Sequence, residues 1–173
     1  MEKSPKDGPV LREDLPPLEL EKMLKEKGYG SEDIASWLKK DILFVSSRKT
    51  GSPAIEAITP ETLTIKKYLS QEKNSLKIDF AFDKAGYRYL ELLSAEIYVG
   101  IIVFLTITAW DLAKGFISSW LYEQYKGMQK DSKDLNVKLE VEIRDEKKGR
   151  IYHIKYAGPA DKVAEIIKER ELK

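Results

Sequence analysis

The 173-residue sequence contains no cysteine and only one histidine, His153. Without cysteine, the chain cannot form a disulfide, a thiolate nucleophile, a thiolate zinc site or an iron–sulfur cluster. With a single histidine, it cannot build a metal site that requires two imidazole ligands. An excess of one charge is also lacking, because 30 lysines and arginines face 29 aspartates and glutamates. The net charge of +1 gives no overall attraction to nucleic acid or to anionic lipid.

Two phosphate-binding motifs are missing as well, since the sequence contains neither G-x-G-x-x-G nor G-x-x-x-x-G-K-[ST]. His153 lies on the polar face of a predicted strand, and no carboxylate near it in the sequence could orient it as a catalytic base. We therefore expect His153 to face solvent. The sequence predicts no catalytic residue, no cofactor and no metal ligand, and it favours a protein that is not an enzyme.

What the sequence does contain is typical of a globular protein, with 42% hydrophobic and 34% charged residues. Lysine and glutamate dominate the charged residues, whereas methionine and asparagine are scarce, a bias found in proteins of heat-loving organisms. Residues 1–13 are charged and lack the apolar stretch of a secretory signal, so we expect a cytoplasmic protein.

Composition divides the chain into three predicted regions. Residues 1–16 have no periodic apolar pattern and are expected to form a disordered arm. Residues 17–72 combine short apolar patterns with glycine and proline, and are predicted to form a small α/β unit of helices and a hairpin. After a polar linker, residues 75–173 are predicted to form a second, α+β domain.

The α+β domain is predicted from strand alternation. Apolar and polar residues alternate over residues 76–82, 135–143 and 152–156, with a hairpin loop at residues 145–149 between the last two strands. A helix follows from Ala160. The order strand–helices–strand–strand–helix is similar to part of a ferredoxin-like fold, an antiparallel sheet with helices on one face. That fold serves many unrelated functions, so it carries no functional inference.

The middle of this domain is unusually apolar, since residues 97–110 carry no charge. Thr108 and Asp111 fit a capping pattern, which predicts a helix over residues 109–126. Residues 97–107 could form a buried helix or a buried strand, and the lack of a preceding turn signal favours a helix. We interpret the segment as a domain core. The alternatives are a single membrane span over residues 92–110 and an exposed face that binds another protein.

The sequence favours a non-catalytic protein-interaction or assembly module, whose central apolar helix binds a protein partner or a second copy of the chain. Phe116, Trp120 and Tyr125 lie on one side of that helix, and tryptophan and tyrosine often dominate interfaces. Glu96 is a candidate functional carboxylate, because it borders the apolar segment with no oppositely charged residue near it.

A nucleic-acid-associated protein is the alternative. Lys147, Lys148 and Arg150 in and after the hairpin loop could contact phosphates, and the first two short helices offer a second candidate surface. Acidic residues are interleaved with these basic ones, which instead indicates a solvated surface. Glu140 and Glu142 likewise share a strand face with basic residues, a pattern typical of cross-strand ion pairs.

Overall fold

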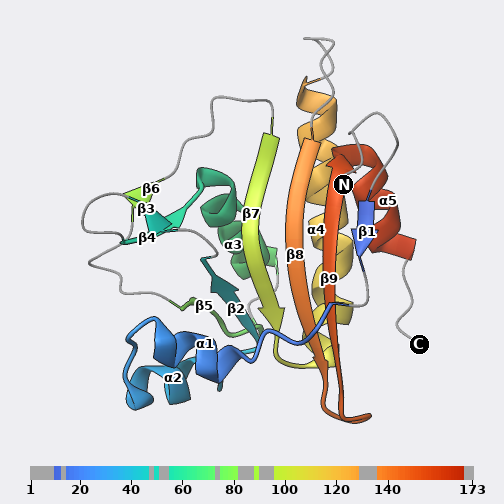
Figure 1. Cartoon of the computed structure of the whole chain (residues 1–173). Helices are drawn as coiled ribbons and strands as arrows, with labels where there is room; N and C mark the ends of the chain where they lie inside the picture. The colour runs from blue at the N-terminus through green and yellow to red at the C-terminus, as the bar shows by residue number, and fades with distance from the viewer. Residues whose placement is uncertain are drawn as a thin grey trace.

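Segments from across the chain meet in one six-stranded sheet (Figure 1). The computed structural model describes residues 10–12, 15–46, 49–50, 55–72, 75–81, 88–89, 96–128 and 136–169. Across the sheet, the strands follow the order β1 (Val10–Arg12), β9 (Arg150–Pro159), β8 (Asn136–Asp145), β7 (Glu96–Phe104), β2 (Ile42–Val45) and β5 (Ile78–Phe80). A small second group of strands contains β3 (Lys49–Thr50), β4 (Ile55–Ile58) and β6 (Arg88–Tyr89).

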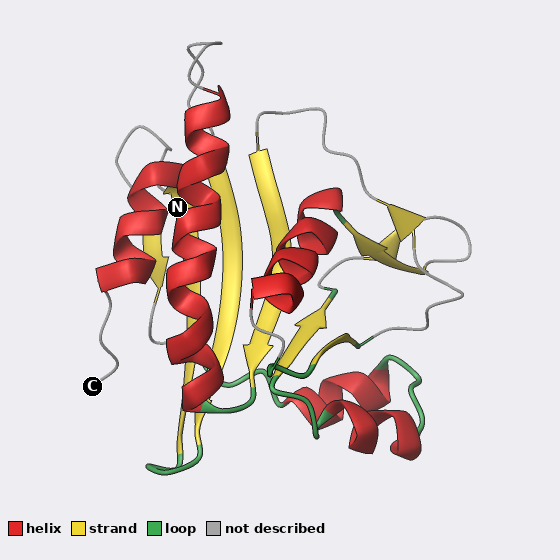
Figure 2. Ribbon diagram, turned by 180° about the vertical axis from the view of Figure 1, so that it is seen from behind, coloured by secondary structure: helices red, strands yellow, loops and turns green. Residues whose placement is uncertain are grey.

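Helices pack on both faces of the large sheet. One face carries α3 (Pro60–Glu72), α4 (Ile107–Met128) and α5 (Ala160–Glu169), which enclose the larger hydrophobic core (Figure 2). On the other face, α1 (Leu20–Glu26) and α2 (Ser31–Trp37) pack against β2 and β7 around a smaller core. The fold is therefore of the α+β class.

The ferredoxin-like order expected from the sequence is not confirmed. In that fold another strand separates the two parallel strands of a βαβ unit. Here β7 and β8 are direct neighbours, run parallel and are joined by α4, while β9 returns antiparallel beside β8. The sheet is consequently mixed rather than antiparallel.

The two regions that the sequence separated, residues 17–72 and 75–173, contribute strands to the same sheet. β2 from the first region lies between β7 and β5 of the second, pairing antiparallel with β7 and parallel with β5. The region expected to be a disordered arm, residues 1–16, also contains structure, because β1 pairs with β9. A strand of three residues is too short to produce a periodic pattern. Residues 1–9, 13 and 14 lie outside the described residues.

The strand β7 corrects the helix that we expected over residues 97–107. Ile102 and Phe104 contact the larger core, whereas Ile101 and Val103 contact the smaller one. Because both faces are buried, the strand reads as a continuous apolar run without alternation. Within the membrane span considered over residues 92–110, residues 96–104 form an extended strand rather than a helix. In the part of the chain that the structure describes, no helix has the length and apolar character needed to cross a membrane.

The helix predicted over residues 109–126 is confirmed as α4, but its first turn is capped differently from the prediction. The hydroxyl of Thr106, rather than Thr108, accepts the N–H of Ala109 at 3.0 Å. The carboxylate of Glu146, at the β8–β9 turn, accepts the N–H of Ile107 at 3.3 Å. Both groups satisfy N–H donors that have no partner within the helix.

Candidate functional site

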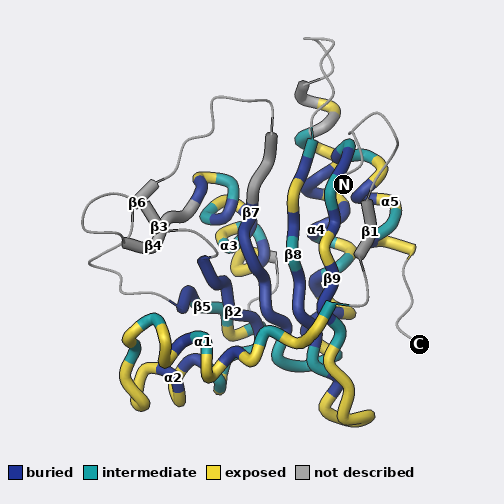
Figure 3. The backbone as a smooth tube through the Cα atoms, viewed as in Figure 1, coloured by how far each residue is buried: buried dark blue, intermediate teal, exposed yellow. Residues whose placement is uncertain are grey.

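The β8–β9 hairpin places a row of charged side chains on the sheet face opposite α4 and α5. Glu140 lies opposite Lys155 in register, and Glu142 lies opposite His153. The residues between them, among them Val141 and Ile154, point into the larger core on the helical face. We call Glu140, Glu142, His153 and Lys155 the arm-binding face, because residues 15–19 cross it (Figure 3).

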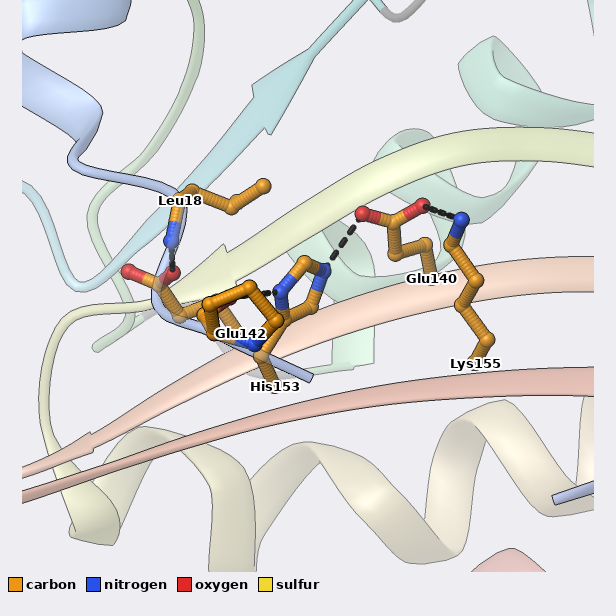
Figure 4. Close-up of polar contacts among 6 residues, drawn as sticks. Leu18, Glu140, Glu142, His153 and Lys155 are labelled. Atoms are coloured by element: carbon orange, nitrogen blue, oxygen red, sulfur yellow. Dashed lines mark hydrogen bonds and ion pairs between the residues drawn. The ribbon is translucent and has the colours of Figure 1, made fainter. Parts of the chain in front are cut away.

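His153 is buried, with 7% of its surface exposed, which corrects our expectation of a solvent-facing side chain. Its Nε2 lies 2.5 Å from Oε2 of Glu140, and Oε1 of the same carboxylate lies 3.6 Å from Nζ of Lys155 (Figure 4). Glu140 is the orienting carboxylate that we did not find near His153 in the sequence. It belongs to the neighbouring strand, 13 residues away.

The segment that covers these side chains is held by its main-chain atoms. Nδ1 of His153 lies 2.7 Å from the carbonyl oxygen of Pro16, and the N–H of Leu18 donates to Oε2 of Glu142 at 2.8 Å (Figure 4). Glu142 is completely buried and also accepts from Nε of Arg144 at 3.3 Å. The two arm groups bound are a backbone C=O and a backbone N–H, so these two contacts do not involve the side chains of Pro16 and Leu18.

Two consecutive prolines explain why this segment is extended. Each proline ring fixes φ near −65°, and a residue that precedes proline is pushed toward the extended region. Leu15 and Pro16, which each precede a proline, are therefore biased against a helix. Prolines also have no N–H, so the first amide donor after Leu15 is that of Leu18, the donor that Glu142 binds.

Both ring nitrogens of His153 face an oxygen atom. Nδ1 faces the backbone carbonyl of Pro16, and Nε2 faces the carboxylate of Glu140. With both ring nitrogens engaged, His153 has no free nitrogen to act as a general base.

Upstream of the prolines, the chain continues the same contact as a strand at the edge of the sheet. Val10 pairs with Ala157 and Arg12 pairs with Lys155 in the antiparallel β1–β9 ladder. We call β1 and residues 15–19 together the arm. The arm therefore meets the hairpin twice, once along its edge and once across its face.

The arm ends at Glu19, which has a strained backbone. Its φ of 52° and ψ of 57° place it in the left-handed region, and among the described residues it is the one non-glycine residue with positive φ. This conformation costs an L-residue roughly 1–2 kcal/mol. The exposed ion pair between Glu19 and Lys22, at 3.7 Å, offsets little of that cost. Glu19 therefore joins the arm to α1 at an energetic cost that this ion pair does not balance.

The aromatic residues predicted to form an interface lie elsewhere. Trp120 is 3% exposed and belongs to the larger core of this chain, so it is not accessible as the predicted interface residue. Phe116 is half-buried, and its ring lies 6.1 Å from that of Tyr68 in α3. The side chain of Tyr125 lies outside the described part of the structure. The helices of the same chain thus cover most of this surface.

The remaining predicted residues are also distant from the arm. Glu96 begins β7 and pairs in register with Asn136, but its side chain is outside what the structure describes. Lys147, Lys148 and Arg150 are exposed at the β8–β9 turn. The nearby Asp145 is buried and accepts the N–H groups of Lys147 and Lys148, both at 3.2 Å.

The chemistry available on the arm-binding face is that of hydrogen bonding to a polypeptide. Among the described residues, no group of three or more acidic or histidine side chains is placed to hold a metal ion. No protein-family model matches the chain, and no curated protein or solved structure matches it. Function is therefore inferred from the contacts that β8 and β9 make with the arm.

Proposed function

We propose that the chain is a non-catalytic protein-interaction or assembly module that binds an extended polypeptide segment on its arm-binding face and along the edge of β9. The observation that supports this proposal most directly is the arm itself. Its backbone carbonyl at Pro16 and its backbone N–H at Leu18 are held by His153 and Glu142, two side chains that the arm buries.

This arrangement combines two known modes of peptide recognition. Addition of a strand to a sheet edge uses main-chain hydrogen bonds for affinity, as β1 does on β9. Capture by buried charged groups gives stronger hydrogen bonds than capture by neutral groups. Leu18 adds an apolar contact with the smaller core. The segment that fits is therefore extended, at least nine residues long in total, and apolar at the position of Leu18.

The test is binding of a peptide that spans residues 10–19. The receptor is the full chain carrying Leu18→Pro, which removes the amide that Glu142 binds and so frees the face from its own arm. We expect saturable binding with one peptide per chain in calorimetry. A peptide with N-methylleucine at position 18 is the matched control, because it loses only that N–H; we expect weaker binding by at least tenfold.

Two results would contradict the proposal. One is the absence of peptide binding to a folded Leu18→Pro chain in which amide exchange shows that the arm is released. The other is equal binding of the two peptides, which would show that the Glu142 contact contributes nothing to recognition.

A further inference from the structure

We infer that two copies of the chain exchange arms, so that the arm-binding face of each copy holds the arm of the other. This inference rests on the proposed function and names its partner as a second copy of the same chain. The observation that carries it is the strained residue Glu19 between the arm and α1.

Glu19 connects two segments that are each held in place by contacts with the sheet. The arm is held on β8 and β9, whereas α1 packs against β2 and β7 on the same side of the sheet. Glu19 lies between these two anchored segments and has a φ of 52°. A short connection under strain favours exchange between copies, because opening the connection relieves the strain while the anchored contacts are kept.

The contacts of the arm can be made equally well by another copy. They consist of the β1–β9 ladder, the contact of His153 with the carbonyl of Pro16, the bond from Leu18 to Glu142, and the packing of Leu18 on the smaller core. None of them requires that arm and face belong to the same chain. The free energy of exchange therefore depends on the strain relieved at two hinges and on the entropy lost by association.

Symmetry and charge are both compatible with a reciprocal pair. When each copy gives one arm and receives one arm, no face and no arm is left over, so the assembly closes at two copies. The net charge of +1 per chain gives only weak repulsion between copies. On the arm-binding face itself, Glu140 and Glu142 are balanced by Lys155 and Arg144.

The first test uses the absence of cysteine to place a covalent reporter. Val10 and Ala157 are partners in the β1–β9 register, so cysteines at these positions would form a cross-strand pair. The full-length variants Val10→Cys and Ala157→Cys are mixed and incubated under mild oxidation. We expect a disulfide-linked heterodimer. A mixture of Val10→Cys with Lys168→Cys, whose cysteine is exposed on α5, controls for random collision.

The second test measures the role of the hinge. In sedimentation equilibrium, Glu19→Gly should raise the dimer dissociation constant by about fivefold per hinge and about 30-fold for the pair, because glycine accepts positive φ without strain. Glu19→Ala is the matched control. It removes the same ion pair with Lys22 but keeps the strain, so its dissociation constant should stay within about twofold of wild type.

The possible results distinguish a failure of arm exchange from a failure of the proposed function. If the double variant Val10→Cys/Ala157→Cys closes within one chain while the mixture gives no heterodimer, exchange is refuted and the arm–face contact stands. A dimer that responds equally to Glu19→Gly and Glu19→Ala would also refute exchange driven by the hinge. If neither disulfide forms and the arm peptide fails to bind, the proposed function fails as well.

Discussion

Removing the carboxylate of Glu142 should release the arm while leaving the rest of the sheet folded. Glu142 is completely buried and accepts the N–H of Leu18 at 2.8 Å. A hydrogen bond to a charged group contributes about 1.5–3 kcal/mol. In Glu142→Ala, amide exchange at Leu18 should therefore accelerate roughly 10- to 150-fold, as measured by NMR. Global stability in urea should fall by about 2 kcal/mol, since Arg144 also loses its partner.

Two further variants test the cause of this effect. Glu142→Gln keeps an oxygen that can accept the Leu18 amide but loses the charge, so its exchange rate should be intermediate. Glu146→Ala removes an exposed carboxylate that accepts the amide of Ile107 at 3.3 Å. It should accelerate exchange at Ile107 and leave Leu18 unchanged. Unaltered exchange at Leu18 in Glu142→Ala would refute the assigned role of this carboxylate.

Two other predictions concern the core and Gly100 in β7. Leu139→Asp places a charge in the larger core and should destabilise the fold by more than about 3 kcal/mol in urea; a midpoint near that of wild type would contradict the packing of β8. Gly100→Ala should destabilise by about 1–2 kcal/mol, because φ is +82° and the new Cβ would lie 3.3 Å from the carbonyl oxygen of Val45. The control is Gly115→Ala on an open face of α4, which should raise the free energy of unfolding by about 0.5–1 kcal/mol. If Gly100→Ala and Gly115→Ala changed the stability equally, the role assigned to the positive φ of Gly100 would be refuted.

Local patterns were sufficient to predict the elements that bury one face. The alternation of β8 correctly placed Val137, Leu139 and Val141 in the core, and the apolar spacing of α4 correctly predicted a long helix. These patterns report directly which side of an element faces water. β7 was missed because it is buried on both sides, which leaves an apolar run that fits a helix or a strand equally well.

The arm-binding face depends on register, which a single sequence determines poorly. A hairpin loop at residues 145–149 would place Arg144 opposite Arg150, whereas the structure pairs Asp145 with Arg150. This difference of one residue decides whether Glu142 meets Tyr152 or His153. A shift of one residue also changes the face on which cross-strand partners meet. The partner of His153 therefore could not be found from local spacing alone.

The arm itself was beyond local prediction, because its contacts span most of the chain. His153 and Pro16 are 137 residues apart, and Leu18 and Glu142 are 124 residues apart. Nothing in residues 10–19 indicates a strand, and two prolines argue against regular structure. Only the assembled hairpin offers the edge and the buried charges that hold this segment in place.

The long distance in sequence between the arm and the β8–β9 hairpin also affects the order in which they are synthesised. Translation proceeds from the N-terminus, so the arm leaves the ribosome before the strands that bind it have been made. At roughly 5–20 residues per second, the 137 residues between Pro16 and His153 correspond to a delay on the order of ten seconds. During that interval the nascent arm has no binding face of its own. An arm that docks during that interval can therefore dock only on the hairpin of a copy whose synthesis has already passed β9.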